Sequence, residues 1–215
     1  MKMNKMITVM LVLSLALSLS ACGGSPAPDA AKDVTYHNEL LGVSFALPSG
    51  WYELELSEKN FSSTPGATGD LSAMEQDGDE EYIYLALGQF ANRKTDNSEQ
   101  HIGLELYADK LQGADTLSAV VEDYISLMTE PDEEGGQWTL KDQYSKTLGG
   151  KNFEVVVFTV PNADNELYEI MSFIHPVKEG FYMTLEADYW PDNKNAVKEI
   201  ESLVETSLSV PAQAA

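Results

Sequence analysis

The side chains of this chain that could act as bases or nucleophiles are few and scattered. Its three histidines, His37, His101 and His175, lie far apart in sequence. Ser49 lies in Leu-Pro-Ser-Gly-Trp, which lacks the first glycine of a nucleophile elbow and is typical of a turn. No Gly-x-Ser-x-Gly, His-Glu-x-x-His or phosphate-binding glycine-rich loop is present. We therefore expect no catalytic residue, with a Ser/His/Asp site assembled in space as the less favoured alternative.

Two acidic segments, residues 70–81 and 122–134, contain no basic residue. Asp77, Asp79 and Glu81 stand at alternate positions and offer the hard oxygens that Ca²⁺ prefers. They do not fit the EF-hand loop, which requires Gly at its sixth position and Glu at its twelfth. We therefore expect solvated acidic loops, no metal site and no other cofactor, with weak cation binding as the alternative.

Aromatic residues could either stack on a ligand or pack the core. Trp51 and Trp190 stand beside predicted turns, where a Trp usually covers a core, and Trp138 is the one expected to be partly exposed. Tyr82 and Tyr84 would share one strand face. Core packing is favoured over an aromatic strip that binds sugars or peptides.

The composition excludes several classes of protein. The 215 residues include 13 Lys and Arg against 35 Asp and Glu, a formal net charge of −22. Such a surface repels the phosphate backbone of nucleic acids, so no nucleic-acid partner is expected, and it repels anionic lipid headgroups. A single Cys excludes an internal disulfide and a zinc site built on several thiolates. With 43% hydrophobic residues, the chain can still form a globular core.

The start of the chain has the order of an export signal. Lys2 and Lys5 precede residues 6–21, which carry no charge. This run is shorter than the roughly 20 apolar residues that a membrane-spanning helix needs. The pattern predicts a signal peptide over residues 1–21.

The signal ends in Leu19-Ser20-Ala21-Cys22, which resembles the lipobox of bacterial lipoproteins. The resemblance implies cleavage between Ala21 and Cys22 and lipidation of the Cys22 thiol. The alternative is an ordinary secretory signal with an incidental Cys. If the thiol carries lipid, the mature chain has no free Cys, which excludes cysteine catalysis and redox switching.

The rest of the chain divides into three parts. Residues 22–33 contain the lipidated Cys and a stretch rich in Gly, Pro and Ala, and should form a flexible tether. Residues 34–210 are expected to form a single domain. Residues 211–215 should be a disordered tail.

Alternation of apolar and polar residues predicts a protein rich in strands. Gly149-Gly150 predicts a two-residue hairpin turn, and residues 153–160 are apolar enough for a central strand. Residues 98–111 are left unassigned because Gly103 weakens a helix there. The predicted strands are residues 41–47, 51–56, 82–90, 138–148, 151–160, 167–175 and 181–189, and the predicted helices are residues 116–129 and 194–208.

Three of these elements have a distinct apolar face. In the first helix this face holds Leu117, Val120, Val121, Tyr124 and Met128. In the second helix it holds Val197, Ile200, Leu203, Val204 and Leu208. In the last strand it holds Phe181, Met183, Leu185, Ala187 and Tyr189.

Strands joined as hairpins, with two separate helices, predict an α+β fold in which helices flank an antiparallel sheet. The run Leu41–Trp51, which reads LGVSFALPSGW, and the order of the elements resemble the PsbP/Mog-like family. The resemblance implies an α/β/α sandwich. Characterised members are mainly non-catalytic, among them photosystem assembly or extrinsic subunits, a small-GTPase-binding protein and bacterial lipoproteins. No functional residue is carried over, because fold likeness alone does not establish function.

Together these patterns predict a lipoprotein on the extracytoplasmic side of a bacterial membrane, held in the cell envelope by lipid on Cys22. The expected role is a non-catalytic binding or assembly module for an envelope protein partner. A small-ligand-binding lipoprotein is the first alternative. Such proteins usually bind the ligand in a cleft between two lobes, and a single domain without an internal duplication argues against that arrangement. An envelope hydrolase is the second.

Overall fold

The computed structural model describes residues 35–53, 75–76, 82–92, 100–111, 116–131, 137–161 and 166–211. For residues 75–76, 82–86, 111 and 179 it describes the backbone alone. The predicted signal, Cys22 and the tether lie outside these ranges. Neither helix in the described ranges has the length and apolarity needed to cross a membrane.

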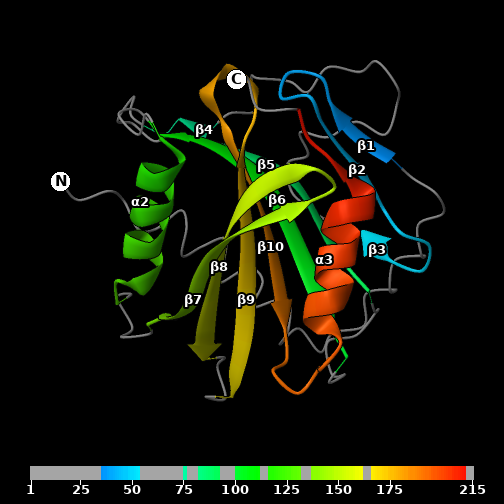
Figure 1. Ribbon diagram of the computed structural model, residues 1–215, viewed down its shortest axis with the longest axis vertical. Helices are drawn as coiled ribbons and strands as arrows, with labels where there is room; N and C mark the ends of the chain where they lie inside the picture. Colours follow the sequence, from blue (N-terminus) through cyan, green and yellow to red (C-terminus); the bar gives the residue numbers. More distant parts are fainter. Residues whose placement is uncertain are drawn as a thin grey trace.

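Most of the fold is one antiparallel sheet of eight strands (Figure 1). Its order is β3-β5-β6-β10-β9-β8-β7, and β4 pairs with β5 beside this path. Five of these pairings join strands that are consecutive in the chain (β4–β5, β5–β6, β7–β8, β8–β9 and β9–β10), as short antiparallel connections allow. The strands are β3 (Tyr52–Glu53), β4 (Glu75–Gln76), β5 (Tyr82–Ala91), β6 (Ile102–Leu111), β7 (Thr139–Leu148), β8 (Lys151–Pro161), β9 (Leu167–Pro176) and β10 (Tyr182–Tyr189).

A second, smaller sheet joins the two ends of the domain. Its order is β1 (Thr35–Asn38), β2 (Val43–Ala46) and β11 (Leu208–Ser209). β11 follows directly on helix α3 (Ala196–Ser207) and pairs with β2. The last strand of the fold therefore lies beside one of the first.

The two helices of the described ranges lie on opposite sides of the large sheet (Figure 1). Helix α2 (Leu117–Thr129) begins at Thr116, whose hydroxyl accepts a hydrogen bond from the Ala119 amide at 3.2 Å. It packs its apolar side on β8 and β9. Helix α3 and the small sheet cover the other side. A short 3₁₀ turn (Lys178–Gly180) joins β9 to β10.

The main core lies between the large sheet, α3 and the small sheet. Phe45 of β2 and Phe90 of β5 join the two sheets, with ring centroids 4.9 Å apart, and Tyr36 lies 5.2 Å from Phe90. Both phenylalanines are almost completely buried. Such large aromatic contacts between layers contribute strongly to the stability of a fold.

A satellite core lies between α2 and the opposite side of the sheet. Val120, Val121 and Met128 of the helix pack on apolar side chains of β8 and β9. The Phe158 ring lies 5.7 Å from Tyr124 and 5.4 Å from Trp138, in edge-to-face contacts. The strands β8 and β9 are therefore buried on both faces.

The structure confirms the predicted antiparallel α+β fold with helices on both faces. The predicted hairpin at Gly149-Gly150 is also confirmed, since both residues have positive φ, 56° and 77°. The predicted apolar faces of the helix at 116–129 and of the strand at 181–189 are buried or half-buried as expected.

Four predictions about the elements were incomplete or wrong. Residues 98–111, left unassigned, contain β6, which lies between β5 and β10. The strand at 153–160 is not central, because its neighbour β7 forms the edge of the sheet. Val197 is 37% exposed, and Leu208 belongs to β11 and not to the helix. The strand β1 was not predicted.

Truncation of Phe90 tests the contact between the two sheets. Phe90→Ala should lower the free energy of unfolding by about 3–5 kcal/mol, because it leaves a cavity between buried aromatic rings. Leu167→Ala, at a side chain that is 55% exposed, should change it by less than about 0.5 kcal/mol. Urea denaturation followed by circular dichroism measures both. Equal effects of the two variants would contradict the assigned core.

Candidate functional site

The three histidines occupy three separate places in the fold. His37 lies on β1 opposite Ser44 of β2, and its Nδ1 is 2.8 Å from the Ser44 hydroxyl. His101 precedes β6, and its Nε2 lies 3.8 Å from a carboxylate oxygen of Asp188 on β10. His175, on β9, is almost fully buried, with carbonyl oxygens 2.7 and 3.3 Å from its ring nitrogens.

The components of a catalytic triad are therefore divided among these places. Within the described residues, His37 has a serine and no carboxylate partner, and His101 has a carboxylate and no serine partner. The partners of His175 are the backbone carbonyls of Asn152 and Pro211. Ser49 lies in an exposed turn, as predicted, where the Trp51 amide donates to the Pro48 carbonyl. Nucleophilic catalysis needs all three groups within hydrogen-bonding reach, and the described residues do not provide this.

The tryptophans pack against apolar clusters. Trp51 is 6% exposed and belongs to the main core, as predicted. Trp138 and Trp190 are half-buried against the satellite core. The side chains of Tyr82 and Tyr84 lie outside the described residues, so the predicted pairing of their faces stays a prediction.

The acidic segments are only partly described. Glu122 and Asp123 lie on the exposed side of α2 and Glu130 follows the helix, also exposed. This agrees with the predicted solvated surface at that segment. The side chains of Asp77, Asp79 and Glu81, like Cys22 and Ala21, lie outside the described residues. Within the described ranges, no group of three or more His, Cys, Asp or Glu residues is arranged to hold a metal ion.

An unpredicted group of acids and tyrosines lies on the α2 side of the large sheet. On β6 and β10 the register places Glu105 opposite Glu186, and Tyr107 opposite Thr184. Asp188 lies opposite Ile170 of the satellite core, which identifies this face as the one that α2 covers. We name this group the acid–tyrosine cluster; it consists of Glu105, Tyr107, Asp109, Glu186 and Asp188 of the sheet and Tyr124 of α2.

Hydrogen bonds link this cluster to the helix. The hydroxyls of Tyr107 and Tyr124 both donate to Oε1 of Glu186, each at 2.7 Å. The hydroxyl oxygen of Tyr124 also lies 2.7 Å from that of Ser172 on β9. Since Tyr124 gives its proton to Glu186, Ser172 must donate to Tyr124. The acidic side chain thus ties two strands and a helix together.

Positive charge is placed on the opposite face of the sheet. Lys110 of β6 lies over the Phe181 ring, 5.7 Å from its centroid, on the main-core side. Lys141 and Lys146 of β7 contact Glu169 and Glu201. The described parts of β5, β9, β10 and α2 contain no Lys or Arg. The buried acids of the cluster are therefore not neutralised by a basic side chain from any of these elements.

This arrangement changes the acidity of the cluster. Burial, and then the charge of Glu186, raises the pKa of Asp109 to about 7. Burial also raises the pKa of Glu186, although the hydrogen bonds from Tyr107 and Tyr124 oppose this change. Burial and the neighbouring Glu186 raise the pKa of both phenols well above the usual value, so Tyr107 and Tyr124 remain hydrogen-bond donors.

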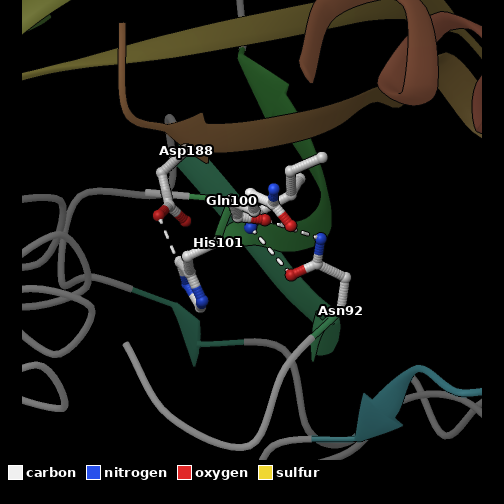
Figure 2. Close-up of polar contacts among 5 residues, drawn as sticks. Asn92, Gln100, His101 and Asp188 are labelled. Atoms are coloured by element: carbon white, nitrogen blue, oxygen red, sulfur yellow. Dashed lines mark hydrogen bonds and ion pairs between the residues drawn. The ribbon is translucent and has the colours of Figure 1, made fainter. Parts of the chain in front are cut away.

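Asp188 is the last acid of the cluster along β10, and the His101 side chain lies beside its carboxylate (Figure 2). Asp188 faces Gly103 across the strand pair, and a Cβ atom built on Gly103 would overlap the Asp188 carboxylate, lying 2.8 Å from its Cγ. Among the described residues, Nδ1 of His101 has no hydrogen-bond partner. Asn92 closes the adjacent connection by donating to the Gln100 carbonyl and accepting from the Ile102 amide, at 3.0 and 2.9 Å.

Part of this cluster left a signal in the sequence. Glu105, Tyr107 and Asp109 alternate with apolar residues, which is the pattern of a strand. The same alternation occurs for Glu186 and Asp188, opposite the predicted apolar face of the strand at 181–189. Such polar positions would normally face water, so their burial could not be read from the pattern.

Gly103→Ala tests the close approach of Asp188. The new methyl group would overlap the buried carboxylate, and we expect a loss of about 1–3 kcal/mol in the free energy of unfolding. Asp188→Ala should relieve the overlap, so the double variant should be more stable than the sum of the two single effects predicts. Chemical denaturation of the wild type, the two single variants and the double variant measures this coupling. If the two single changes in unfolding free energy add up to that of the double variant, the contact between Gly103 and Asp188 is contradicted.

No protein-family model matches the chain, and no curated protein matches its sequence. Solved structures do match it. The solution structure of CyanoP, the cyanobacterial PsbP of Synechocystis sp. PCC 6803, is 15% identical with a TM-score of 0.49, covering 90% of this chain and 99% of that one. LpqN of Mycobacterium tuberculosis, involved in cell envelope biogenesis, is 15% identical with a TM-score of 0.42, covering 75% and 91%. PA94 of Pseudomonas aeruginosa, a protein of unknown function, is 11% identical with a TM-score of 0.44, covering 77% and 100%.

Proposed function

We propose that this chain is a bacterial lipoprotein, held by lipid on Cys22 at the extracytoplasmic side of a membrane. We propose that its domain binds or assembles an envelope protein and catalyses no reaction. The observation that carries the anchor is the position of the only Cys, directly after an uncharged run that ends in Leu19-Ser20-Ala21. The thiol stands where a lipobox requires it.

The length of the tether fits this placement. The described fold begins at Thr35, in the small sheet. A fully extended chain spans about 3.3–3.6 Å per residue, so the residues between Cys22 and Thr35 are long enough to hold the domain clear of lipid headgroups. The net charge of −22 also favours distance from an anionic surface.

The non-catalytic role is supported by the separation of the possible catalytic groups. The partner of His37 is a serine and that of His101 an aspartate, on different sheets. A domain whose polar groups are used in internal hydrogen bonds, as in the acid–tyrosine cluster, is suited to present a stable outer surface to a partner.

The anchor is tested with Cys22→Ala and the matched variant Ser25→Ala, which leaves the lipobox unchanged. Metabolic labelling with a fatty acid that carries an alkyne should mark the wild-type chain and Ser25→Ala, and should not mark Cys22→Ala. The wild type should sediment with membranes, and Cys22→Ala should be released. Labelling of Cys22→Ala would contradict the assigned position.

The binding role is tested by crosslinking in living cells, followed by mass spectrometry of the proteins that copurify. We expect one reproducible envelope protein with the wild type and with Ser25→Ala, and its loss with Cys22→Ala. A tightly bound metabolite in native mass spectra, without any enriched protein, would favour a small-ligand-binding lipoprotein. Turnover in an esterase, peptidase or glycosidase screen, abolished by a point variant, would contradict the non-catalytic role.

A further inference from the structure

The strand β7 forms a long edge of the large sheet (Figure 1). It pairs with β8 on one side, and in the described part of the chain no strand pairs with its other side. Most of its side chains are exposed, whereas most of those on β8, β9 and β10 are buried. The unpaired backbone groups of such an edge can accept a further strand.

The two lysines of β7 do not block this edge. Lysine side chains commonly keep other chains away from an edge strand. Here Lys141 contacts Glu169 of β9, and Lys146 contacts Glu201 of α3. Both ammonium groups are thus held against acids of their own domain, and the backbone of β7 remains accessible.

The outward backbone groups of β7 belong to alternate residues. In a two-residue hairpin the residues that flank the turn, here Leu148 and Lys151, exchange their backbone hydrogen bonds. Counting back by twos, the even-numbered residues of β7 bond toward β8. The odd-numbered residues Gln143, Ser145 and Thr147 therefore direct their N–H and C=O groups outward.

A contact of the Gln143 amide agrees with this direction. The amide donates to Oδ1 of the neighbouring Asp142, at 2.9 Å. Beyond Asp142 the pairing with β8 is shifted by a β-bulge, which interrupts the alternation before Leu140. The regular part of the edge therefore runs from residue 142 to residue 148.

The side chains of this regular part have an order that fits a second copy of the same strand. Asp142, Tyr144 and Lys146 all lie opposite main-core residues of β8, so they share one face. Along that face an acid, a phenol and an amine follow one another, with the phenol midway. When two such strands pair in antiparallel directions, the acid of each can face the amine of the other.

One register brings these charges together. Outward residues must pair with outward residues, and with Tyr144 on the two-fold axis Asp142 of each copy lies opposite Lys146 of the other. One step to either side, with Gln143 or Ser145 on the axis, both charged residues face an uncharged side chain. Facing opposite charges and facing aromatic rings both stabilise a strand pair, so the sequence of β7 favours the register centred on Tyr144.

The net charge restricts where two copies can meet. Each chain carries −22, so two copies repel each other except where negative charge is locally low. The exposed side of α2 carries Glu122 and Asp123, without a basic residue. In contrast, β7 carries Lys141 and Lys146 against the single acid Asp142. The edge of β7 is therefore a place where two copies can approach.

We propose that two copies of this chain associate through the outer edge of β7, paired antiparallel with Tyr144 on the two-fold axis. Gln143 of each copy exchanges backbone hydrogen bonds with Ser145 of the other. Asp142 leaves the Gln143 amide and pairs with Lys146 of the other copy, whose side chain is 34% exposed. The two large sheets become one continuous sheet. This association goes beyond the proposed function and does not depend on the lipid anchor.

Disulfide crosslinking of the full-length chain tests the register. Tyr144→Cys places a thiol on the axis, where facing Cα atoms lie about 4.5 Å apart, within the range that a disulfide bridges. Gln143→Cys and Ser145→Cys are the matched controls, because each thiol then lies too far from its own copy. After mild oxidation, non-reducing gels should show at least about fivefold more dimer for Tyr144→Cys than for either control. The unsubstituted chain reports any dimer formed through Cys22.

Charge reversal tests the pairing of Asp142 with Lys146. Asp142→Lys alone and Lys146→Glu alone each place like charges opposite one another, and each should weaken the dimer by about tenfold or more. An equimolar mixture of the two variants restores opposite charges at both contacts, so it should form a mixed dimer. Native mass spectrometry of the full-length proteins released from detergent distinguishes monomer, dimer and mixed dimer by mass.

A third variant tests the backbone of the edge. Ser145→Pro removes an outward N–H and leaves the bonds toward β8 in place, so it should abolish the dimer. Ser145→Ala loses the same hydroxyl and should dimerise as the wild type does. If Lys146→Glu fails to fold because position 146 also faces Glu201, this pair of variants decides the question.

Three results would overturn the proposal. The first is an unsubstituted chain that stays monomeric at every concentration measured. The second is a dimer that persists unchanged in Asp142→Lys and in Ser145→Pro, which would place the contact elsewhere. The third is oxidation of Tyr144→Cys that yields no more dimer than the two controls, or that links this position to a different protein, since β7 would then pair in another register or with another chain.

Discussion

The structure depends on the burial of both faces of one sheet. A strand in such a sheet needs partners on two sides, and its alternate side chains must suit two different surroundings. Toward α3 and the small sheet the side chains are almost wholly apolar, and aromatic contacts such as Phe45 on Phe90 join the layers. Toward α2 the apolar cluster is smaller. On β6 and β10 this face instead carries carboxylates and phenols, whose hydrogen bonds replace part of the missing apolar contact.

Local patterns in the sequence were sufficient for much of the fold. The helix at 116–129, the turn at Gly149-Gly150 and the apolar face of the strand at 181–189 all follow from the period of apolar residues or from glycine chemistry. Residues 98–111 were left unassigned because Gly103 weakens a helix there, and the strand β6 was not predicted. In the folded protein the missing side chain of Gly103 makes space for the Asp188 carboxylate on the neighbouring strand. The need for a glycine at this position comes from a residue far along the chain, so it cannot be predicted from the neighbouring sequence.

The acid–tyrosine cluster could not be predicted for the same reason. Glu186 and Asp188 alternate with apolar residues, as solvent-facing positions do. Glu186 is buried because β6 and α2, distant in sequence, bring Tyr107 and Tyr124 against it. Asp188 is buried against Gly103 of the neighbouring strand β6. The order of strands has the same non-local origin. The strand β8 is apolar on both faces because the main core covers one face and α2 covers the other. This does not require a place in the middle of the sheet, and β8 lies beside the edge strand β7.

The small sheet has a consequence for the time at which the domain can fold. Its strands come from residues 35–46 and from Leu208–Ser209, so they unite the first and the last strands of the described domain. Pairings between such distant segments form late, because a long loop must close first. A chain that is still being synthesised lacks the strand that completes this sheet until Leu208–Ser209 has been added. The small sheet is therefore one of the last parts of the domain to take its final form.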